Sequence, residues 1–397
     1  MKILLLCPYF YPESNAAAVR GQAFAKYLSK EGAEVSVIVP EKSDIPNDTI
    51  KYEGCRVDRI KTYNTIGESH HFLFSLLYLP FSIFELIRKI KKNKPNLIIA
   101  SIPSPFLALE GLCVAKYLGV PIILDVRDTW IAGMEVHEGA LRNKIKILLE
   151  KLICSYVDLI FSVTPLQKKT IVEVYNIPQS KIKVVYNGAD LEIFSKIKIN
   201  KEVDFIHLGG ARVYYDTLNL IVAFSYIVKK LPNTTLKFVG CLDDNYTEDV
   251  KKCVKKLDLF DNIILLPQIP YEKVPIELAK ARIGVISLSF NKAFEPAIGV
   301  KTYEYMAMGL PTAYLGPSNN EQYNIIKINN VGVCSSNPKE FAEKCLFLLE
   351  NEKIREEMGK NALEVVKKYD RKRIVKEAYE KYIKPLVESE NGMDRGT

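Results

Sequence analysis

Residues 281–316 read ARIGVISLSFNKAFEPAIGVKTYEYMAMGLPTAYLG and contain the pattern that decides the fold. The apolar run at 281–288 predicts a buried strand, residues 301–309 predict a short helix, and the run at 311–316 predicts the next strand. A strand, a helix and a strand in this order form a right-handed crossover, which places both strands, parallel, in one sheet. The stretch therefore predicts an α/β architecture.

The same alternation fills the rest of the chain. The apolar runs lie at 2–7, 34–40, 97–101, 121–126, 159–164 and 183–187 in the first half, and at 204–210, 236–240, 262–267, 283–288, 311–316 and 332–335 in the second. Amphipathic stretches typical of helices separate them, and a lysine-rich stretch at 195–204 separates the two series. Because 397 residues are two to three times the usual domain size, we expect two doubly wound, Rossmann-like α/β domains that face a central cleft and join near 194–202.

Composition and short motifs exclude several classes of protein. With 48% hydrophobic and 26% charged residues, the chain is neither disordered nor fibrous. The eight cysteines never come closer than eleven positions, which excludes C-x-x-C zinc and redox pairs. The start, MKILLLCPYFYPE, lacks the long apolar region of a signal peptide, so we expect a buried strand and a cytoplasmic protein with reduced thiols. No dinucleotide-binding glycine motif, phosphate-binding P-loop or H-E-x-x-H occurs.

The charge and one apolar segment bear on a membrane. The net charge is +8, and most of this excess falls in residues 1–200. Residues 72–87, FLFSLLYLPFSIFELI, are too short to cross a bilayer, which needs about 20 apolar residues, and a lysine- and arginine-rich stretch follows at 88–94. This composition fits a segment that lies on an anionic membrane face, and it equally fits a core helix whose C-terminal end carries cations. Both interpretations stay open.

Polar residues follow two predicted strands of the first half. Asn15 stands at the expected start of a helix with Arg20 one turn later, which is either an anion site or an N-cap with an exposed arginine. Arg127 and Asp128 follow the run at 121–126, and charge at the end of a buried strand is costly unless it is paired or used. We expect a functional role there, with Asp128 placed to orient an acceptor hydroxyl or to stabilise positive charge at a sugar carbon.

The second half holds a more specific constellation. Gly209 and Gly210 follow its first strand and precede Arg212, a pattern that lets a backbone approach a phosphate. Lys301 lies beside the expected start of the 301–309 helix, where the helix dipole also favours a diphosphate. One turn further in, Glu304 is placed to accept hydrogen bonds from a ribose diol.

These motifs resemble those of the retaining glycosyltransferases of family 4, which have the two-domain GT-B fold. The resemblance spans nearly the whole chain and rests on PYFYPE, VRDTW, SVTPLQ, VVYNGAD, LLPQIPYEKVP, ARIGVISL and KTYEYMAMGLP. It is greatest to bacterial capsule, O-antigen and exopolysaccharide members. It implies a first domain, 1–195, that binds a glycan or polyprenyl-diphosphate-linked acceptor, and a second domain, 203–373, that binds a nucleoside diphosphate sugar, with UDP favoured. A terminal helix at about 374–388 is expected to return to the first domain.

The resemblance also implies roles for individual residues. Glu304 holds the ribose, Lys301 and Arg212 face the diphosphate, and the main chain near Gln268 and Ile269 reads the base. The full set of expected donor-site residues is Gly209, Gly210, Arg212, Gln268, Ile269, Gly299, Val300, Lys301, Thr302 and Glu304. The expected acceptor-site residues are Asn15, Arg20, Arg127 and Asp128, and the expected catalytic residues are Asp128, Glu295 and Lys301.

The chain departs from the family pattern in ways that keep alternatives open. The paired glutamates of the family lie eight positions apart, whereas Pro296 stands eight before Glu304, with Glu295 beside it. We expect a hexosyl- or N-acetylhexosaminyltransferase that acts without a metal, since Asp243 and Asp244 fit a solvated turn better than a metal site and His207 fits a core histidine. The alternatives are a nucleotide-sugar epimerase of the same architecture and a degenerate homologue that binds nucleotide without turnover.

Overall fold

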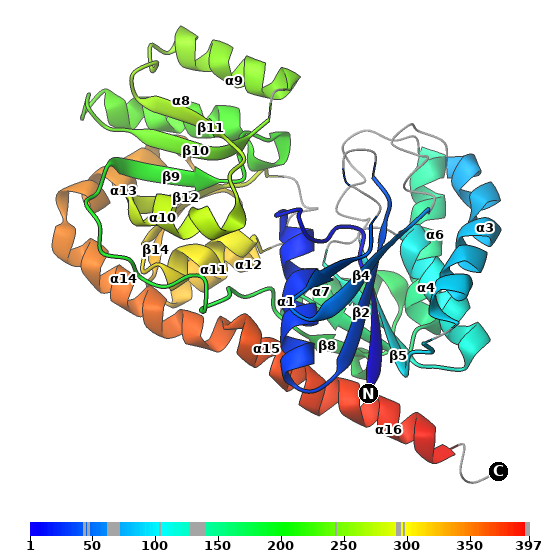
Figure 1. Ribbon diagram of the computed structural model, residues 1–397. Helices are drawn as coiled ribbons and strands as arrows, with labels where there is room; N and C mark the ends of the chain where they lie inside the picture. Colours follow the sequence, from blue (N-terminus) through cyan, green and yellow to red (C-terminus); the bar gives the residue numbers. More distant parts are fainter. Residues whose placement is uncertain are drawn as a thin grey trace. The chain divides into compact units, whose positions relative to one another are not determined.

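The computed structural model describes residues 1–42, 45, 48–61, 72–91, 93–102, 105–127, 140–242, 244–290, 295–296 and 298–393 (Figure 1). The chain divides into two compact units, and each is treated by itself. Unit 1 comprises Met1–Asn187 and Arg371–Thr397, and unit 2 comprises Gly188–Asp370. Both are α/β units of the Rossmann type, as the sequence predicts, and apart from one antiparallel edge strand in unit 1 their described strands are parallel.

Unit 1 is built on one sheet of eight described strands in the order β3-β4-β2-β1-β5-β6-β7-β8. The strands are β1 (Lys2–Leu6), β2 (Glu34–Pro40), β3 (Ile50–Tyr52), β4 (Cys55–Ile60), β5 (Leu97–Ile102), β6 (Ile122–Val126), β7 (Leu159–Ser162) and β8 (Ile182–Val184). The helices are α1 (Ala16–Lys30), α3 (Phe72–Ile90), α4 (Pro105–Leu118), α6 (Ala140–Tyr156), α7 (Pro165–Tyr175), α15 (Arg371–Ala378) and α16 (Lys384–Met393). The predicted strands of the first half are all present.

The sequence pattern did not predict the hairpin β3–β4 at the edge of this sheet. Its strands are antiparallel, and Glu53 and Gly54 connect them with φ angles of 48° and 82°. Positive φ at both central residues is the geometry of a type I′ turn, which Asn-Gly or Asp-Gly usually signals. Glu-Gly in a polar stretch carries a weaker signal.

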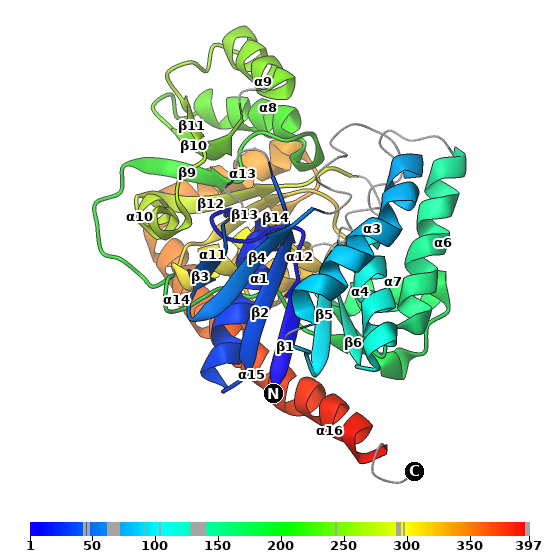
Figure 2. The same ribbon diagram turned by 45° about the vertical axis from the view of Figure 1, so that its right-hand side comes forward.

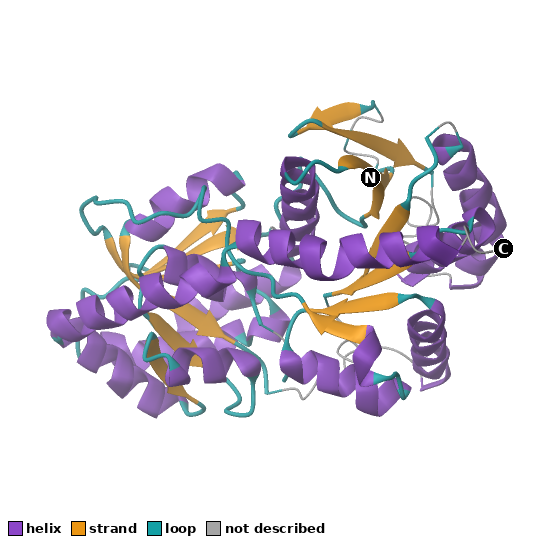
Figure 3. Ribbon diagram, turned by 90° about the horizontal axis from the view of Figure 1, so that it is seen from below, coloured by secondary structure: helices purple, strands orange, loops and turns teal. Residues whose placement is uncertain are grey.

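The C-terminal segment packs on unit 1. Helices α15 and α16 join through a π-helical turn at Tyr379–Ile383, and Figure 3 shows them as one long ribbon that leads to the C-terminus. Val375 and Ile383 are buried in the same apolar cluster as Tyr27 of α1. Helix α16 runs to Met393, a few residues beyond the terminal helix expected at about 374–388.

Unit 2 is built on a second sheet, whose described strands are all parallel and run in the order β11-β10-β9-β12-β13-β14. The strands are β9 (Val203–Leu208), β10 (Leu236–Cys241), β11 (Ile263–Pro267), β12 (Ala281–Ser287), β13 (Thr312–Leu315) and β14 (Gly332–Ser335). The helices are α8 (Thr217–Val228), α9 (Asn245–Lys256), α10 (Val274–Ala279), α11 (Val300–Ala307), α12 (Glu321–Ile328), α13 (Pro338–Glu350) and α14 (Glu352–Val366).

The division between the units falls earlier than the lysine-rich stretch suggests. The backbone N–H of Ala189 donates to the carbonyl of Tyr369 at 3.0 Å, and Phe194 is buried in the core of unit 2. These contacts attach residues 188–202 to unit 2, so the chain passes between the units at 187–188 and again at 370–371. In the sequence, this attachment is indicated by the apolar residues that lie within the lysine-rich stretch.

Helix α3 contains the apolar segment that raised the question of a membrane. It spans Phe72–Ile90, with Pro80 inside it, and it packs on α4. None of the helices in the described ranges is both long enough and apolar enough to cross a membrane.

Candidate functional site

Helix α11 carries the charged residues of the specific constellation, and its packing on the sheet fixes their positions. The Tyr305 hydroxyl accepts a hydrogen bond from the backbone N–H of Leu208 at 2.9 Å and donates to the carbonyl of Val285 at 3.2 Å. A Cβ atom at Gly284 would lie 2.4 Å from the Tyr305 ring, so glycine in β12 leaves the space for this ring. Tyr305 therefore holds α11 against the carboxyl ends of β9 and β12.

Lys301 lies buried at the start of α11, close to the end of β9. Its Nζ is 3.4 Å from the centroid of the Tyr215 ring and 3.5 Å from Nε2 of His207. Within the described part of the chain, no carboxylate forms an ion pair with this ammonium group. Burial lowers the pKa of Lys301 well below its ordinary value, a shift that the charge of Glu304 opposes and that of Arg212 reinforces. Lys301 is thus a buried lysine without a carboxylate counter-ion among the described residues.

His207 is the polar neighbour of this lysine. Burial, and then the charge of Lys301, lower the pKa of His207 well below its ordinary value, so the imidazole is neutral, and its Nε2 shares a 3.5 Å contact with Lys301 Nζ. The ring lies between Tyr215 and Phe238, at centroid distances of 5.1 and 5.2 Å. Its Nδ1 has no hydrogen-bond partner among the described residues. His207 is buried within strand β9, as the sequence predicts for a core histidine.

Glu304 lies one helical turn after Lys301 and is also buried. Its Oε1 accepts a hydrogen bond from the Tyr271 hydroxyl at 2.7 Å. Tyr271 follows Gln268 and Ile269 in the segment after β11, so this bond ties that segment to α11. The structure thereby brings together the residues that we expect to hold the ribose and to read the base.

The glycine loop after β9 packs against the loop after β10. Gly209 and Gly210 have φ angles of +98° and +65°, and both of their N–H groups donate to the carbonyl of Val239 at 2.9 Å. A Cβ atom at Gly210 would lie 2.1 Å from the carbonyl oxygen of Gly240. The two glycines thus permit a close backbone contact, and their N–H groups are engaged within the unit.

Arg212 follows this loop and is half-buried. Its guanidinium donates to the carbonyls of Ala211 at 2.6 Å and Gly240 at 3.4 Å, and it lies 3.9 Å from a carboxylate oxygen of Asp244. Asp244 itself caps α9, since it accepts from the backbone N–H of Thr247 at 2.8 Å. Arg212 therefore adds a second cation near Lys301.

The start of α11 is braced from α12. The carboxamide oxygen of Gln322 accepts from the backbone N–H of Gly299 at 2.8 Å and from the Thr302 hydroxyl at 2.9 Å, which orients the first turn, including Val300. Glu295 is held separately, because its carboxylate accepts from the side chain of Asn319 at 2.6 Å. No contact in the described ranges joins Glu295 to Lys301.

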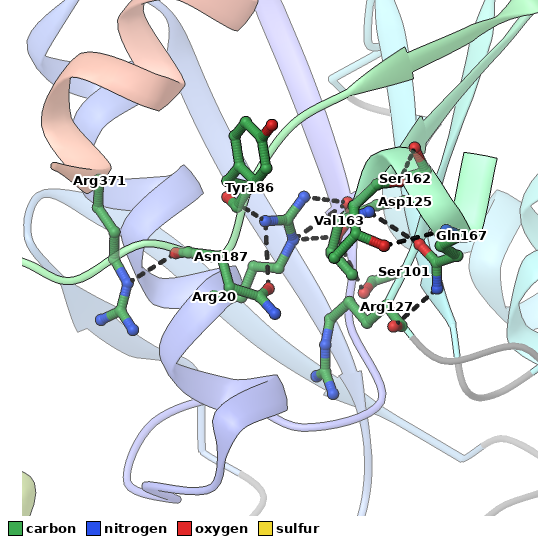
Figure 4. Close-up of polar contacts among 11 residues, drawn as sticks. Arg20, Ser101, Asp125, Arg127, Ser162, Val163, Gln167, Tyr186, Asn187 and Arg371 are labelled. Carbon is green, nitrogen blue, oxygen red and sulfur yellow. Dashed lines mark hydrogen bonds and ion pairs between the residues drawn. The ribbon is translucent and has the colours of Figure 1, made fainter. Parts of the chain in front are cut away.

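In unit 1 a buried ion pair lies at the carboxyl end of β6 (Figure 4). The Arg20 guanidinium contacts both oxygens of Asp125, at 2.7 Å from Nη2 and 3.0 Å from Nε, and it donates to the carbonyl of Tyr186 at 2.8 Å. The Ser101 hydroxyl donates to the same carboxylate at 3.3 Å. Arg20 is therefore neither exposed nor available as the free cation of an anion site.

The remaining predicted acceptor residues lie around this pair. The Asn15 side chain caps α1 by accepting from the N–H groups of Ala17 and Ala18 at 3.0 Å, so its interpretation as an N-cap is confirmed. The carbonyl of Arg127 accepts from the Gln167 side chain at 3.0 Å. Asp128 lies outside the described residues, and its role stays a prediction.

In the described ranges, no group of three or more histidine, cysteine, aspartate or glutamate side chains is placed to hold a metal ion. Asp243 lies outside these ranges. The expectation that the reaction needs no metal stays a prediction.

Sequence reasoning missed Tyr215 and Tyr271, which contact Lys301 and Glu304. Neither stands in a motif that signals a ligand, since Tyr215 ends a short 3₁₀ turn, Val213–Tyr215, and Tyr271 begins another, Tyr271–Lys273. His207, a polar residue in an otherwise apolar strand, was the one visible signal of a buried polar cluster.

Comparison with known proteins agrees with this geometry. The family model described as Glycosyltransferase Family 4 matches residues 17–193, and the model described as Glycosyl transferases group 1 matches residues 189–365. Together they span both units. The first unit thus carries a glycosyltransferase family 4 domain and the second a glycosyl transferases group 1 domain.

Solved structures of the same fold cover nearly the whole chain at low identity. Sucrose-phosphate synthase from Thermosynechococcus elongatus matches with a TM-score of 0.79 and 15% identity over 97% of this chain and 99% of that one. HepE of Anabaena in complex with UDP and glucose matches with a TM-score of 0.74 and 14% identity over 96% and 98%. A glycosyltransferase from Rickettsia africae matches with a TM-score of 0.69 and 17% identity over 97% and 98%. The protein has the GT-B fold and is a glycosyltransferase.

Proposed function

We propose that the protein transfers a sugar, with retention of anomeric configuration, from a UDP-sugar to a hydroxyl group of a glycan or of a polyprenyl-diphosphate-linked acceptor. One observation carries the proposal for the donor: Lys301 is a buried lysine without a described carboxylate partner, at the carboxyl ends of parallel strands. A diphosphate supplies the missing negative charge. The structure of HepE with UDP and glucose shows that a protein of this fold binds such a ligand.

Each part of the donor meets a different group of unit 2 in this proposal. The diphosphate lies beside Lys301 and Arg212, the ribose diol donates to Glu304, and the base lies near the main chain of Gln268 and Ile269. Tyr271 holds the Glu304 carboxylate in place through its 2.7 Å hydrogen bond. Two acceptor oxygens on Glu304 suit two neighbouring hydroxyl groups.

The reaction breaks the bond between the anomeric carbon and the diphosphate oxygen and forms a bond between that carbon and the acceptor oxygen. The acceptor hydroxyl loses its proton, and UDP leaves with the electron pair of the broken bond. Fixed cations aimed at the leaving diphosphate stabilise the charge that develops on it, which is the main catalytic contribution expected of Lys301 and Arg212. Asp128 and Glu295 are the proposed further catalytic residues, and unit 1 is the proposed acceptor domain.

The product is proposed to enter a surface polysaccharide of the capsule, O-antigen or exopolysaccharide type, made at the inner face of the cell membrane. This assignment rests on the resemblance of the motifs and on the apolar and basic helix α3, which suits a lipid-linked acceptor. A lipid-linked acceptor places the enzyme at this face of the membrane.

Thermal shift with UDP-, GDP-, ADP- and TDP-sugars tests the donor, because a ligand that binds only the folded state raises stability by about 2.7 kcal/mol at a hundredfold excess over Kd. We expect UDP-sugars to raise the Tm most. Incubation with the selected donor alone, followed by chromatography, distinguishes a transferase from an epimerase. A new sugar nucleotide formed without acceptor would identify an epimerase, and binding without turnover for any acceptor would identify a degenerate homologue.

A further inference from the structure

The turn that follows β9 and the segment that follows β12 present exposed apolar side chains. Val213 and Tyr214 are 59% and 43% exposed, and Phe290, three residues after the end of β12, is 49% exposed. The backbone N–H of Ser289 donates to the carbonyl of Tyr214 at 2.9 Å, so a hydrogen bond joins the two segments. We call Val213, Tyr214 and Phe290 the apolar rim. Apolar side chains that gather at the carboxyl ends of parallel strands are typical of a ligand site.

The apolar rim adjoins the buried lysine of the donor site. The ring centroid of Tyr214 lies 4.4 Å from that of Tyr215, and the two rings meet edge to face. Lys301 Nζ lies 3.4 Å from the centroid of the same Tyr215 ring. One aromatic side chain, Tyr215, thus contacts both Lys301 and the rim.

The order of the strands gives the direction in which the donor extends. The strands run in the order β11, β10, β9 and β12, as Figures 1 and 2 show. In the proposed function the base lies near the segment after β11, and the diphosphate lies beside Lys301, close to the end of β9. The sugar is attached to the diphosphate at the end away from the base. We therefore expect the sugar to extend toward the end of β12, which Phe290 follows.

The side chains of the apolar rim suit an apolar part of a sugar. A sugar hydroxyl that valine or phenylalanine covers loses its hydrogen bonds to water, and this loss is unfavourable. The methyl group of an N-acetyl substituent has no such bonds to lose, and its burial against apolar side chains is favourable. Of the two activities that the sequence leaves open, hexosyl and N-acetylhexosaminyl transfer, the rim favours the second.

We propose that the apolar rim binds the sugar of the donor and selects an N-acetylated sugar. Tyr214, the member of the rim that contacts Tyr215, packs against the sugar ring, and Val213 and Phe290 take the methyl group of the acetyl substituent. This inference rests on the proposed function, because the diphosphate at Lys301 determines where the sugar lies. It makes the protein an N-acetylhexosaminyltransferase.

Calorimetric titration of the full chain tests the proposal, with UDP, UDP-glucose, UDP-galactose and the N-acetylated counterparts of both sugars. Burial of one methyl group corresponds to a factor of about five in Kd, so one of the N-acetylated donors should bind about fivefold more tightly than its hexose counterpart. Phe290→Ala and Val213→Ala should each bring this ratio closer to one and leave the Kd for UDP unchanged. Phe290→Leu keeps an apolar side chain and should keep most of the ratio.

Phe260→Ala is the matched control. Phe260 is 80% exposed and precedes β11, so it lies at the amino end of that strand, at the edge of the sheet opposite to the apolar rim. Its replacement should change none of the dissociation constants. Because all of these side chains are exposed, each variant should unfold at the same temperature as the wild type.

Two results would overturn the proposal: hexose donors that bind as tightly as the N-acetylated ones, or a ratio that Phe290→Ala and Val213→Ala leave unchanged. Titration of Lys301→Met with UDP separates this inference from the proposed function. A Kd for UDP that Lys301→Met leaves unchanged would overturn the proposed function, and this inference with it. A Kd for UDP that rises in Lys301→Met, together with a ratio that the rim variants do not alter, would overturn this inference alone.

Discussion

Replacing Lys301 with methionine should weaken UDP binding and, at the same time, stabilise the protein without ligand. Methionine keeps the length of the side chain and its contact with Tyr215 but removes the charge. A hydrogen bond between a charged pair contributes about 1.5–3 kcal/mol, so the Kd for UDP should rise about 10- to 150-fold. Uridine, which has no diphosphate, should bind equally to both proteins.

The stability of the ligand-free protein should change in the opposite direction. Burying a polar group without a full set of partners costs about 1–3 kcal/mol, and the contact of the ammonium with the Tyr215 ring returns about 0.5–2 kcal/mol. The net gain from Lys301→Met is therefore about 1 kcal/mol, or about 2–4 °C in Tm for a domain of this size.

The gain in stability from Lys301→Met should decrease as the pH rises. The pKa of Lys301 is lowered in the folded protein, so the unfolded chain holds this proton more tightly, and the stability of the wild type rises as the pH rises from the lowered value toward the ordinary 10.5. The advantage of the variant is thus full below the lowered pKa and is lost as the pH approaches 10.5.

Calorimetric titration with UDP and uridine, combined with thermal unfolding between about pH 6 and pH 10, measures all three effects. Lys327→Met is the matched control, because Lys327 also lies over a tyrosine ring, that of Tyr323 at 5.4 Å, but is exposed. It should change neither affinity nor Tm. An unchanged Kd for UDP in Lys301→Met would refute the reasoning that places the diphosphate at this lysine.

Three further predictions follow from other parts of the structure. In the same titrations, Glu304→Gln should raise the Kd for UDP and for uridine by the same factor, about tenfold, and Tyr271→Phe should raise both by a smaller factor. A loss of affinity confined to UDP would contradict the assignment of Glu304 to the ribose. Gly210→Ala should lower the free energy of unfolding in urea by about 3 kcal/mol or more, because Gly210 has a φ of +65° and a backbone oxygen would lie 2.1 Å from the new Cβ. Gly119→Ala should lower it by about 1 kcal/mol, because Gly119 has a similar φ of +62° but open space around it. Equal losses would contradict the packing of the two glycine loops. Burial raises the pKa of Glu110 to about 7 from an ordinary 4.5, so the free energy of unfolding should fall by about 3 kcal/mol as the pH rises between these values. Glu110→Gln should remove this fall. If the free energy of unfolding depends on pH in the same way in the variant and in the wild type, Glu110 ionises freely.

The sequence predicted the alternation of strands and helices well, because buried parallel strands are short apolar runs and helices repeat with a different period. It failed where the signal was weak or absent. The Glu53–Gly54 turn has an unusual first residue, and helix α12 (Glu321–Ile328) was not predicted although Asn320 caps it.

For the candidate site, the sequence identified charges but could not tell which of them were already paired. Arg20 and Lys301 both follow loops after strands, yet Arg20 is neutralised by Asp125, more than 100 positions later in the chain, whereas no described carboxylate pairs with Lys301. Pairing of this kind depends on which strands become neighbours in the sheet, here β1, β5 and β6, and local sequence does not record it. Tyr215 and Tyr271 were missed for the same reason.

A crystal structure of the protein with UDP tests the central claim most directly. We expect the diphosphate within hydrogen-bonding distance of Lys301 Nζ and near Arg212, and the ribose hydroxyl groups on the Glu304 carboxylate. UDP bound elsewhere, or bound in unit 2 with Lys301 and Glu304 untouched, would contradict the account.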